Sequence, residues 1–153
     1  TPRTLFPYTT LFRSGLSSAP AIAEMVEGIV VEKLSPAKND KFNPIREGIP
    51  KFREMTNEER KELIAKDPSY GKIVCRCETV TEGEILNAIR RPLGAKDLDG
   101  IKRRTRAGMG KCQSGFCSTK IVALLSKELG IPETEVTKFG GKSNLLIGED
   151  KEI

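Results

Sequence analysis

The chain contains no histidine and no tryptophan among its 153 residues, and aromatic residues make up only 5% of it. The lack of histidine excludes mixed cysteine–histidine zinc sites, histidine-ligated iron–sulfur centres and catalytic pairs that use an imidazole base. The apolar fraction of 37% is low and falls in short patterns between polar stretches. Such a sequence predicts a small module attached to a larger protein rather than one thick hydrophobic core.

Long apolar runs and an ordered signal sequence are also absent. Because no run of about eighteen apolar residues occurs, no membrane span is expected. The N-terminus lacks a basic region, an apolar region and a cleavage site in that order, so a cytoplasmic location is expected. The net charge of +5 comes from interspersed Lys, Arg, Asp and Glu. A nucleic-acid partner is not expected, because the basic group at residues 102–106 has no aromatic neighbours for base stacking.

The segment from Thr4 to Ser14 resembles the conceptual translation of a common sequencing adapter. Residues 1–14 are therefore assigned as non-native and are excluded from fold reasoning. On this interpretation the native protein is expected to begin upstream of Gly15.

Apolar residues recur at helical spacing from residue 19 to about residue 33, which predicts one amphipathic helix. Ser17 or Ser18 is expected to cap this helix, with Pro20 in its first turn. Residues 35–70 contain several prolines and are predicted to form an extended linker wrapped over a surface.

Four further helices are expected, one inside the linker and three after it, and each has a recognisable start or stop signal. They cover about residues 56–66, 81–90, 98–105 and 115–129. The last has the strongest apolar stripe and is expected to carry Cys117 in its first turn, with Phe116 packed in the core.

The four cysteines, at positions 75, 77, 112 and 117, form a C-x-C pair and a C-x4-C pair. A chain without a secretion signal is expected in a reducing compartment, where thiols stay free. Metal binding or redox chemistry is therefore favoured over disulfides. In an extended segment residues i and i+2 face the same side, so Cys75 and Cys77 can share one centre while Arg76 points away. The two helices between the pairs are long enough to fold back and bring the pairs together.

A [2Fe-2S] cluster on four thiolates carries a net charge of about −2 and needs hydrogen-bond donors and cations nearby. The predicted helix N-terminus near Gly115 supplies donors, and glycines allow the backbone to approach the sulfurs closely. The candidate residues around the cluster are Gly108, Gly110, Gly115, Arg76, Arg106 and Lys111.

A four-cysteine zinc site would use the same thiolates without electron transfer. The single-residue gap of the C-x-C pair counts against it, because zinc knuckles space their cysteines two to four residues apart. From spacing alone the cluster, zinc and unligated regulatory thiols all stay open.

The sequence around the cysteines resembles the bacterioferritin-associated-ferredoxin (BFD)-like [2Fe-2S] domain, in the version appended to flavoproteins similar to anaerobic glycerol-3-phosphate dehydrogenase. The resemblance is carried by the segments Ile73–Glu78, Val80–Ile85 and Arg103–Cys117 and extends over about residues 70–148. It implies that Cys75, Cys77, Cys112 and Cys117 are all cluster ligands.

The segment from Gly15 to Ile22 is similar to the one that closes the FAD domain in this flavoprotein class. The similarity implies FAD contacts at Gly15, Leu16 and Ser17 in the complete protein, where a helix N-terminus would favour the electron-rich flavin. The glycine-rich dinucleotide fingerprint is absent from the chain, so the fragment is not expected to hold FAD by itself.

The sequence therefore predicts a mainly α, small α+β chain: a helix-turn-helix-type BFD-like iron–sulfur domain preceded by a linker and a single helix. The expected parts are residues 1–14 (non-native), 15–34 (last helix of a truncated FAD domain), 35–70 (linker), 71–148 (iron–sulfur domain) and 149–153 (tail).

The expected function is that of a C-terminal fragment of an FAD-dependent oxidoreductase, whose cluster passes electrons singly from the flavin to a second flavoprotein or iron–sulfur subunit. No residue of the fragment is expected to be catalytic. The alternative is a zinc- or cluster-stabilised docking or redox-sensing module without electron transfer.

Overall fold

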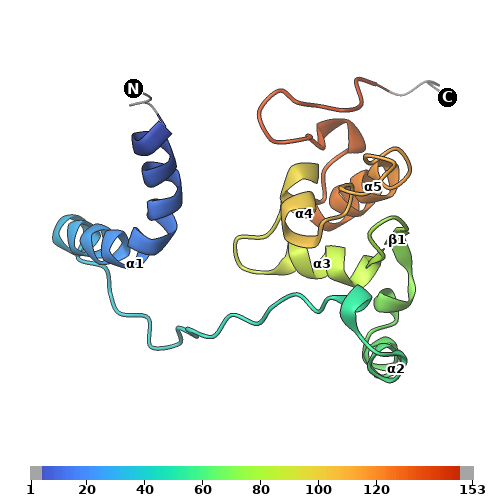
Figure 1. Ribbon diagram of the computed structural model, residues 1–153, viewed down its shortest axis with the longest axis horizontal. Coiled ribbons are helices and arrows are strands. Elements are labelled where there is room, and N and C mark those ends of the chain that lie inside the picture. The colour runs from blue at the N-terminus through green and yellow to red at the C-terminus, as the bar shows by residue number, and fades with distance from the viewer. Residues whose placement is uncertain (1–4, 149–153) are drawn as a thin grey trace. The chain divides into compact units, whose positions relative to one another are not determined.

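The computed structural model describes residues 5–148, with side chains described from residue 17 onward. These residues fall into two compact units that divide between Arg46 and Glu47. The chain is mainly helical, as predicted, with one small two-stranded sheet (Figure 1). The α-helices are α1 (Leu5–Leu34), α2 (Asn57–Lys66), α3 (Glu82–Arg90), α4 (Leu98–Thr105) and α5 (Ser118–Leu129); the strands are β1 (Ile73–Cys75) and β2 (Val80–Thr81); the 3₁₀ helices are η1 (Phe52–Glu54), η2 (Pro68–Gly71) and η3 (Glu133–Glu135).

Helix α1 makes up most of the first unit and begins at Leu5, so the start predicted near residue 19 is wrong. Ser17 and Ser18 lie inside the helix and do not cap it, and Pro20 lies in its interior rather than in its first turn. Proline lacks an N–H and bends a helix without necessarily ending it, which agrees with the bend of α1 in Figure 1. The assignment of residues 1–14 as non-native stays a prediction, and residues 1–4 lie outside the described part of the chain.

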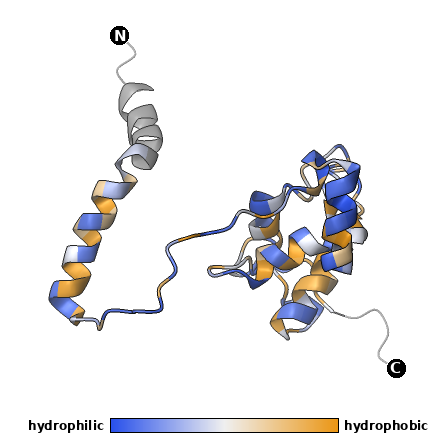
Figure 2. Cartoon of the chain, turned by 90° about the horizontal axis from the view of Figure 1, so that it is seen from below, coloured by the Kyte–Doolittle hydropathy of each residue, from blue (hydrophilic) through white to orange (hydrophobic). Residues whose placement is uncertain are grey.

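The C-terminal half of α1 carries apolar side chains that recur along the helix, as Figure 2 shows. These side chains are exposed: Ile22, Met25, Val26, Ile29, Val30, Val31 and Leu34. None of the helices in residues 5–148 is both long and apolar enough to cross a membrane.

The start and stop signals of the helices in the second unit are largely confirmed. Thr56 and Thr81 each form a complete capping box, with Glu59 and Glu84 respectively. The Asp97 side chain accepts from the N–H of Gly100 at the start of α4, and Gly130 ends α5 in the left-handed conformation. These signals succeed because each is a contact between residues three or four positions apart.

The second half of the predicted linker packs against the cysteine-containing part of the chain. We call residues 47–55 the strap. Phe52 in the strap and Tyr70 in η2 are both buried, with exposed fractions of 7% and 5%. The Phe52 N–H donates to Glu84 Oε1 (3.3 Å), so the capping carboxylate of α3 also holds the strap. The predicted domain boundary at residue 71 stays a prediction. The compact unit that contains the cysteines begins at Glu47.

The core of the second unit lies between α3, α4 and α5, which pack against one another (Figure 1). Strands β1 and β2 pair antiparallel, with Cys75 opposite Val80, and close one side of this core. The apolar side chains without measurable exposure are Ile85, Ala88, Ile101, Leu125 and Val136. Next to Val136, the carbonyls of Thr137 and Lys138 accept from the first two N–H groups of α4, at 3.2 and 2.8 Å. The segment after Val136 therefore holds the start of α4, the helix that leads into the loop of Cys112.

Candidate metal centre

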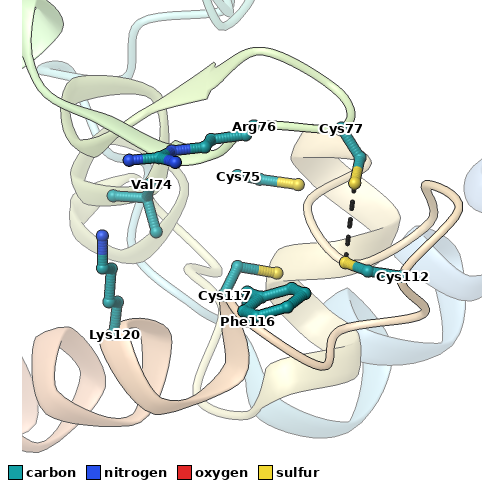
Figure 3. Close-up of a pocket in the computed structure, with 8 residues that line it drawn as sticks. All are labelled: Val74, Cys75, Arg76, Cys77, Cys112, Phe116, Cys117 and Lys120. Carbon is teal, nitrogen blue, oxygen red and sulfur yellow. Dashed lines mark hydrogen bonds between the residues drawn. The ribbon is translucent and has the colours of Figure 1, made fainter.

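All four cysteines line one cavity of about 380 Å³, although they come from two segments that lie far apart in the sequence. Figure 3 shows their sulfur atoms pointing toward a common space. All four thiols are free. Cys75 and Cys117 are buried, with exposed fractions of 1% and 2%, whereas Cys77 is exposed. The cavity therefore has an inner pair of thiols and an outer pair, Cys77 and Cys112, nearer to solvent.

The thiols are arranged as two pairs. Cys77 Sγ and Cys112 Sγ lie 3.5 Å apart, and the thiol of Cys117 has that of Cys75 as its interacting neighbour. A single zinc ion needs four sulfurs at about 2.3 Å from one point. Within residues 5–148 no group of three or more cysteine or carboxylate side chains is arranged to hold one ion. Four thiolates that converge on one cavity form a donor set that both a [2Fe-2S] cluster and a four-cysteine zinc ion use.

The first two cysteines are placed by the β1–β2 hairpin. Cys75 is the last residue of β1, and Cys77 lies in the four-residue turn at 76–79 rather than in an extended segment. Both sulfurs still face the cavity, and the Arg76 side chain extends away from them (Figure 3). The turn explains this, because it reverses the chain directly after the buried strand residue.

The segment before α5 forms a turn, so the prediction that this helix starts at residue 115 is wrong. Helix α5 begins at Ser118, and Cys117 is its N-cap residue rather than part of its first turn. Residues 111–117 form turns instead, and Gln113 and Ser114 among them have positive φ, 47° and 72°. Left-handed residues are rare outside glycine and interrupt a helix.

This turn points backbone donors at a thiol. Hydrogen bonds from the Cys77 thiol and from the N–H of Phe116 lower the pKa of Cys112, and the N–H groups of Ser114 and Gly115 act in the same direction. Consecutive N–H groups that face one atom form an anion-binding nest. Cys112 therefore lies in surroundings that favour its thiolate.

Cys117, one of the inner pair, has the opposite surroundings. Burial, and then the neighbouring Cys75, raise the pKa of Cys117 to about 11. A buried thiol is neutral by default, so a metal that binds here has to displace a proton.

Only some of the residues predicted to surround the centre contact the cavity or its cysteines. Arg76 lines the cavity, whereas Arg106 and Lys111 do not. Gly110 lies directly against Cys77, Gly115 lies against the carbonyl of Cys112, and Gly108 takes a left-handed φ of 87° beside Ser114.

The structure corrects the sequence interpretation at Phe116. It also adds two residues near the cysteines that the sequence analysis missed, Lys120 and Glu78. Phe116 lines the cavity but is 82% exposed, so its prediction as a core residue is wrong. Lys120 also lines the cavity; its place three residues after Cys117, on the same helical face, is a signal that could have found it. Glu78 follows Cys77 directly and accepts hydrogen bonds from two arginines.

A small, mainly helical domain with four convergent cysteines and no histidine defines the class of cysteine-ligated metal domains. Residues 73–127 match the family described as the BFD-like [2Fe-2S] binding domain. The chain therefore contains a BFD-like [2Fe-2S] binding domain.

Similarity to complete proteins extends further along the chain. A glycerol 3-phosphate dehydrogenase of Caloramator mitchellensis is 49% identical over 140 residues, which are 90% of this chain and 29% of that protein. An anaerobic glycerol-3-phosphate dehydrogenase subunit of Escherichia coli (strain K12) is 42% identical over 58 residues, 38% of this chain and 10% of that protein. The HcnB subunit of the Pseudomonas aeruginosa hydrogen cyanide synthase is 47% identical over 53 residues, 32% of this chain and 11% of that protein.

The chain thus spans less than a third of the length of the relatives it matches. No solved structure matches it.

Proposed function

We propose that Cys75, Cys77, Cys112 and Cys117 hold a [2Fe-2S] cluster, and that the chain is the C-terminal part of an FAD-dependent oxidoreductase. The observation that carries the proposal is the convergence of four free thiols, in two pairs, on one cavity inside the segment that matches the [2Fe-2S] family.

When bound, a [2Fe-2S] cluster takes up and releases one electron at a time. The chain's own residues would set the conditions for this transfer. The N–H groups of residues 114–116 stabilise negative charge at Cys112, and burial of Cys75 and Cys117 keeps water from the inner pair. Exposed Cys77 and Phe116 leave one side of the cavity open, and Lys120 lies on the cavity wall. We propose that this side admits the electron-accepting partner.

The parent activity proposed is the oxidation of a 2-hydroxy compound such as glycerol 3-phosphate, in a cytoplasmic enzyme. Relatives that carry glycerol-3-phosphate dehydrogenase names support it. In that enzyme FAD would transfer electrons to the cluster, and a second flavoprotein or iron–sulfur subunit would accept them. Most of the matched relatives bear subunit names, which is compatible with such a partner.

The rest of the FAD domain is the proposed partner of helix α1. The exposed apolar side chains of α1 need a covering surface, and Gly15, Leu16 and Ser17 are the proposed FAD contacts. In the structure these three residues lie inside α1 rather than at a helix N-terminus, so the expected dipole argument does not apply to this helix as it stands.

Anaerobic purification followed by iron, sulfide and zinc analysis tests the centre. We expect about two iron and two sulfide per chain, a visible absorption band that bleaches on reduction, and an electron-spin signal in the reduced form. Serine at any of the four cysteine positions is expected to lower the iron content, and Ser118→Ala, next to Cys117, is the matched control.

A colourless protein with about one zinc per chain would overturn the cluster. If a cluster is present but the reduced protein passes no electrons to an added one-electron acceptor, the relay is wrong and a docking or sensing role stands in its place.

A further inference from the structure

Glu78 is a partly buried carboxylate placed directly after the second cysteine. Its side chain is 11% exposed, and its Oε2 atom accepts from Arg106 Nε (3.0 Å) and from Arg53 Nη1 (3.3 Å). A charge removed from water to this extent needs partners. A surface ion pair has one cationic partner, whereas the Glu78 carboxylate has two guanidinium partners. Each of these arginines comes from a different segment of the chain.

Arg106 joins the turn of Cys77 to the loop of Cys112. Arg106 ends α4 in the left-handed conformation (φ 68°), and its carbonyl accepts from the N–H of Met109 (3.0 Å). The next residue after Met109 is Gly110, which lies against Cys77. The bond between Glu78 and Arg106 therefore joins the same two loops whose close approach Gly110 allows.

Arg53 comes from the strap, which lies outside the matched residues 73–127. Its backbone is held by Arg60, whose Nε donates to the Phe52 carbonyl (3.0 Å) and whose Nη2 donates to the Arg53 carbonyl (3.1 Å). The Arg60 guanidinium also lies over the Phe52 ring, 5.1 Å from its centre. The strap thus delivers a positive charge to the carboxylate next to Cys77 from a segment that carries no cysteine.

We propose that Glu78 is a positioning residue that sets the spacing of Cys77 and Cys112 through Arg106, and that Arg53 balances its charge beside the metal centre. The first half stands on the protein alone. The second half rests on the proposed [2Fe-2S] cluster. A reduced cluster is more negative than an oxidised one, so a nearby negative charge lowers its potential and a nearby positive charge raises it.

The spacing is tested without metal in a Cys75→Ser, Cys117→Ser chain, which retains only the outer pair. In a glutathione redox buffer, the Cys77 and Cys112 thiols and one oxidised glutathione give one protein disulfide and two reduced glutathiones. The equilibrium yields the effective concentration of the two thiols toward each other. We expect Glu78→Ala and Arg106→Ala to lower it by about fivefold or more, the scale of a lost charge-assisted hydrogen bond.

Conservative and control variants separate positioning from general destabilisation. Arg106→Lys keeps a donor and is expected to restore part of the effective concentration. Two control variants break other ion pairs: Arg103→Ala breaks the pair with Asp99, and Glu82→Ala breaks the pair with Lys72. Both are expected to leave the effective concentration unchanged. If Glu78→Ala does not fold, Glu78→Gln and Arg106→Lys carry the test. Equal effective concentrations in the Arg106 and Arg103 variants would overturn the positioning role.

The charge balance is tested by the midpoint potential of the cluster-loaded protein. We expect Glu78→Gln to raise the potential, Arg53→Gln to lower it, and the double variant to lie between them. Shifts of the same sign, or loss of iron without any shift, would reject the charge balance. A protein that passes the disulfide test but binds no cluster refutes the proposed function and leaves the positioning role in place.

Discussion

Gly110 lies against Cys77 so closely that a methyl group at position 110 would overlap the Cβ atom of Cys77. The two residues belong to different loops, and their contact allows the sulfur atoms of Cys77 and Cys112 to approach to 3.5 Å. Since the obstructing atom is attached directly to the backbone, the loop as a whole would have to move. The absence of a side chain at position 110 is therefore a condition for the outer thiol pair.

Gly110→Ala is accordingly expected to separate the two cysteine loops. We expect the free energy of unfolding of the metal-free protein to fall by about 1–3 kcal/mol, the usual cost of overpacking, and the iron content to fall with it. Urea unfolding and metal analysis measure the two effects. Gly48→Ala is the control, because a methyl group there meets open space. Iron content and stability equal to those of the control would contradict the prediction.

Gly83 gives a second steric prediction, and here two effects oppose each other. Alanine in a helix is favoured over glycine by about 1 kcal/mol, but a methyl group at Gly83 would overlap the ring of buried Tyr70. We expect the overlap to win, so that Gly83→Ala lowers the free energy of unfolding by about 1–3 kcal/mol. In a Tyr70→Ala background the same change is expected to become neutral or stabilising. Urea unfolding of the four proteins tests this reversal of sign.

Local signals made most of the helices of the second unit predictable from sequence. A capping box such as that of Thr81 and Glu84 needs only residues three positions apart, and both of its hydrogen bonds form as expected. The cysteine spacing likewise indicated that one site draws on residues 75–77 and 112–117, which the structure brings to one cavity.

The predictions that were wrong or missing concern backbone conformations and long-range contacts, which a short stretch of sequence does not specify. Strand β2 has two residues, too few to show an alternating pattern. Gln113 and Ser114 adopt left-handed conformations that their residue types do not announce, so the sequence does not show the turn that continues to Cys117 and delays the start of α5. The pairs of Glu78 with Arg53 and Arg106 join residues 25 and 28 positions apart. Helix α1 continues through Pro20 because a proline within a helix bends it more readily than it ends it.

The ion pair between Arg90 and Glu128 gives a prediction for pH dependence. Arg90 Nε and Nη2 donate to the two carboxylate oxygens at 2.6 and 2.8 Å and join α3 to α5. These hydrogen bonds lower the pKa of Glu128 below its ordinary value of 4.5. A carboxyl with a lowered pKa stabilises the folded state above the unfolded pKa, and the contribution is lost as pH falls through the folded value.

A double-mutant cycle with Arg90→Ala and Glu128→Ala measures this contribution. We expect a coupling free energy of about 0.5–1 kcal/mol at pH 7, because the pair is bidentate but exposed on the arginine side. The coupling should approach zero near pH 2. The control is the same cycle for Arg103 and Asp99, which lie in one helix with Arg103 Nη2 3.6 Å from Asp99 Oδ2. Its coupling free energy is expected to be less than about 0.5 kcal/mol. A coupling that grows on acidification would contradict the assignment.

The exposure of Phe116 predicts that this aromatic residue contributes little to stability. Its side chain is 82% exposed on the cavity wall, whereas Leu125, on the apolar face of α5, has no exposed surface. We expect Phe116→Ala to change the free energy of unfolding by less than about 0.5 kcal/mol and Leu125→Ala to lower it by about 2–5 kcal/mol. Urea unfolding of the metal-free proteins compares the two. A large loss for Phe116→Ala would place the ring in the core and close the side of the cavity through which we propose that electrons leave.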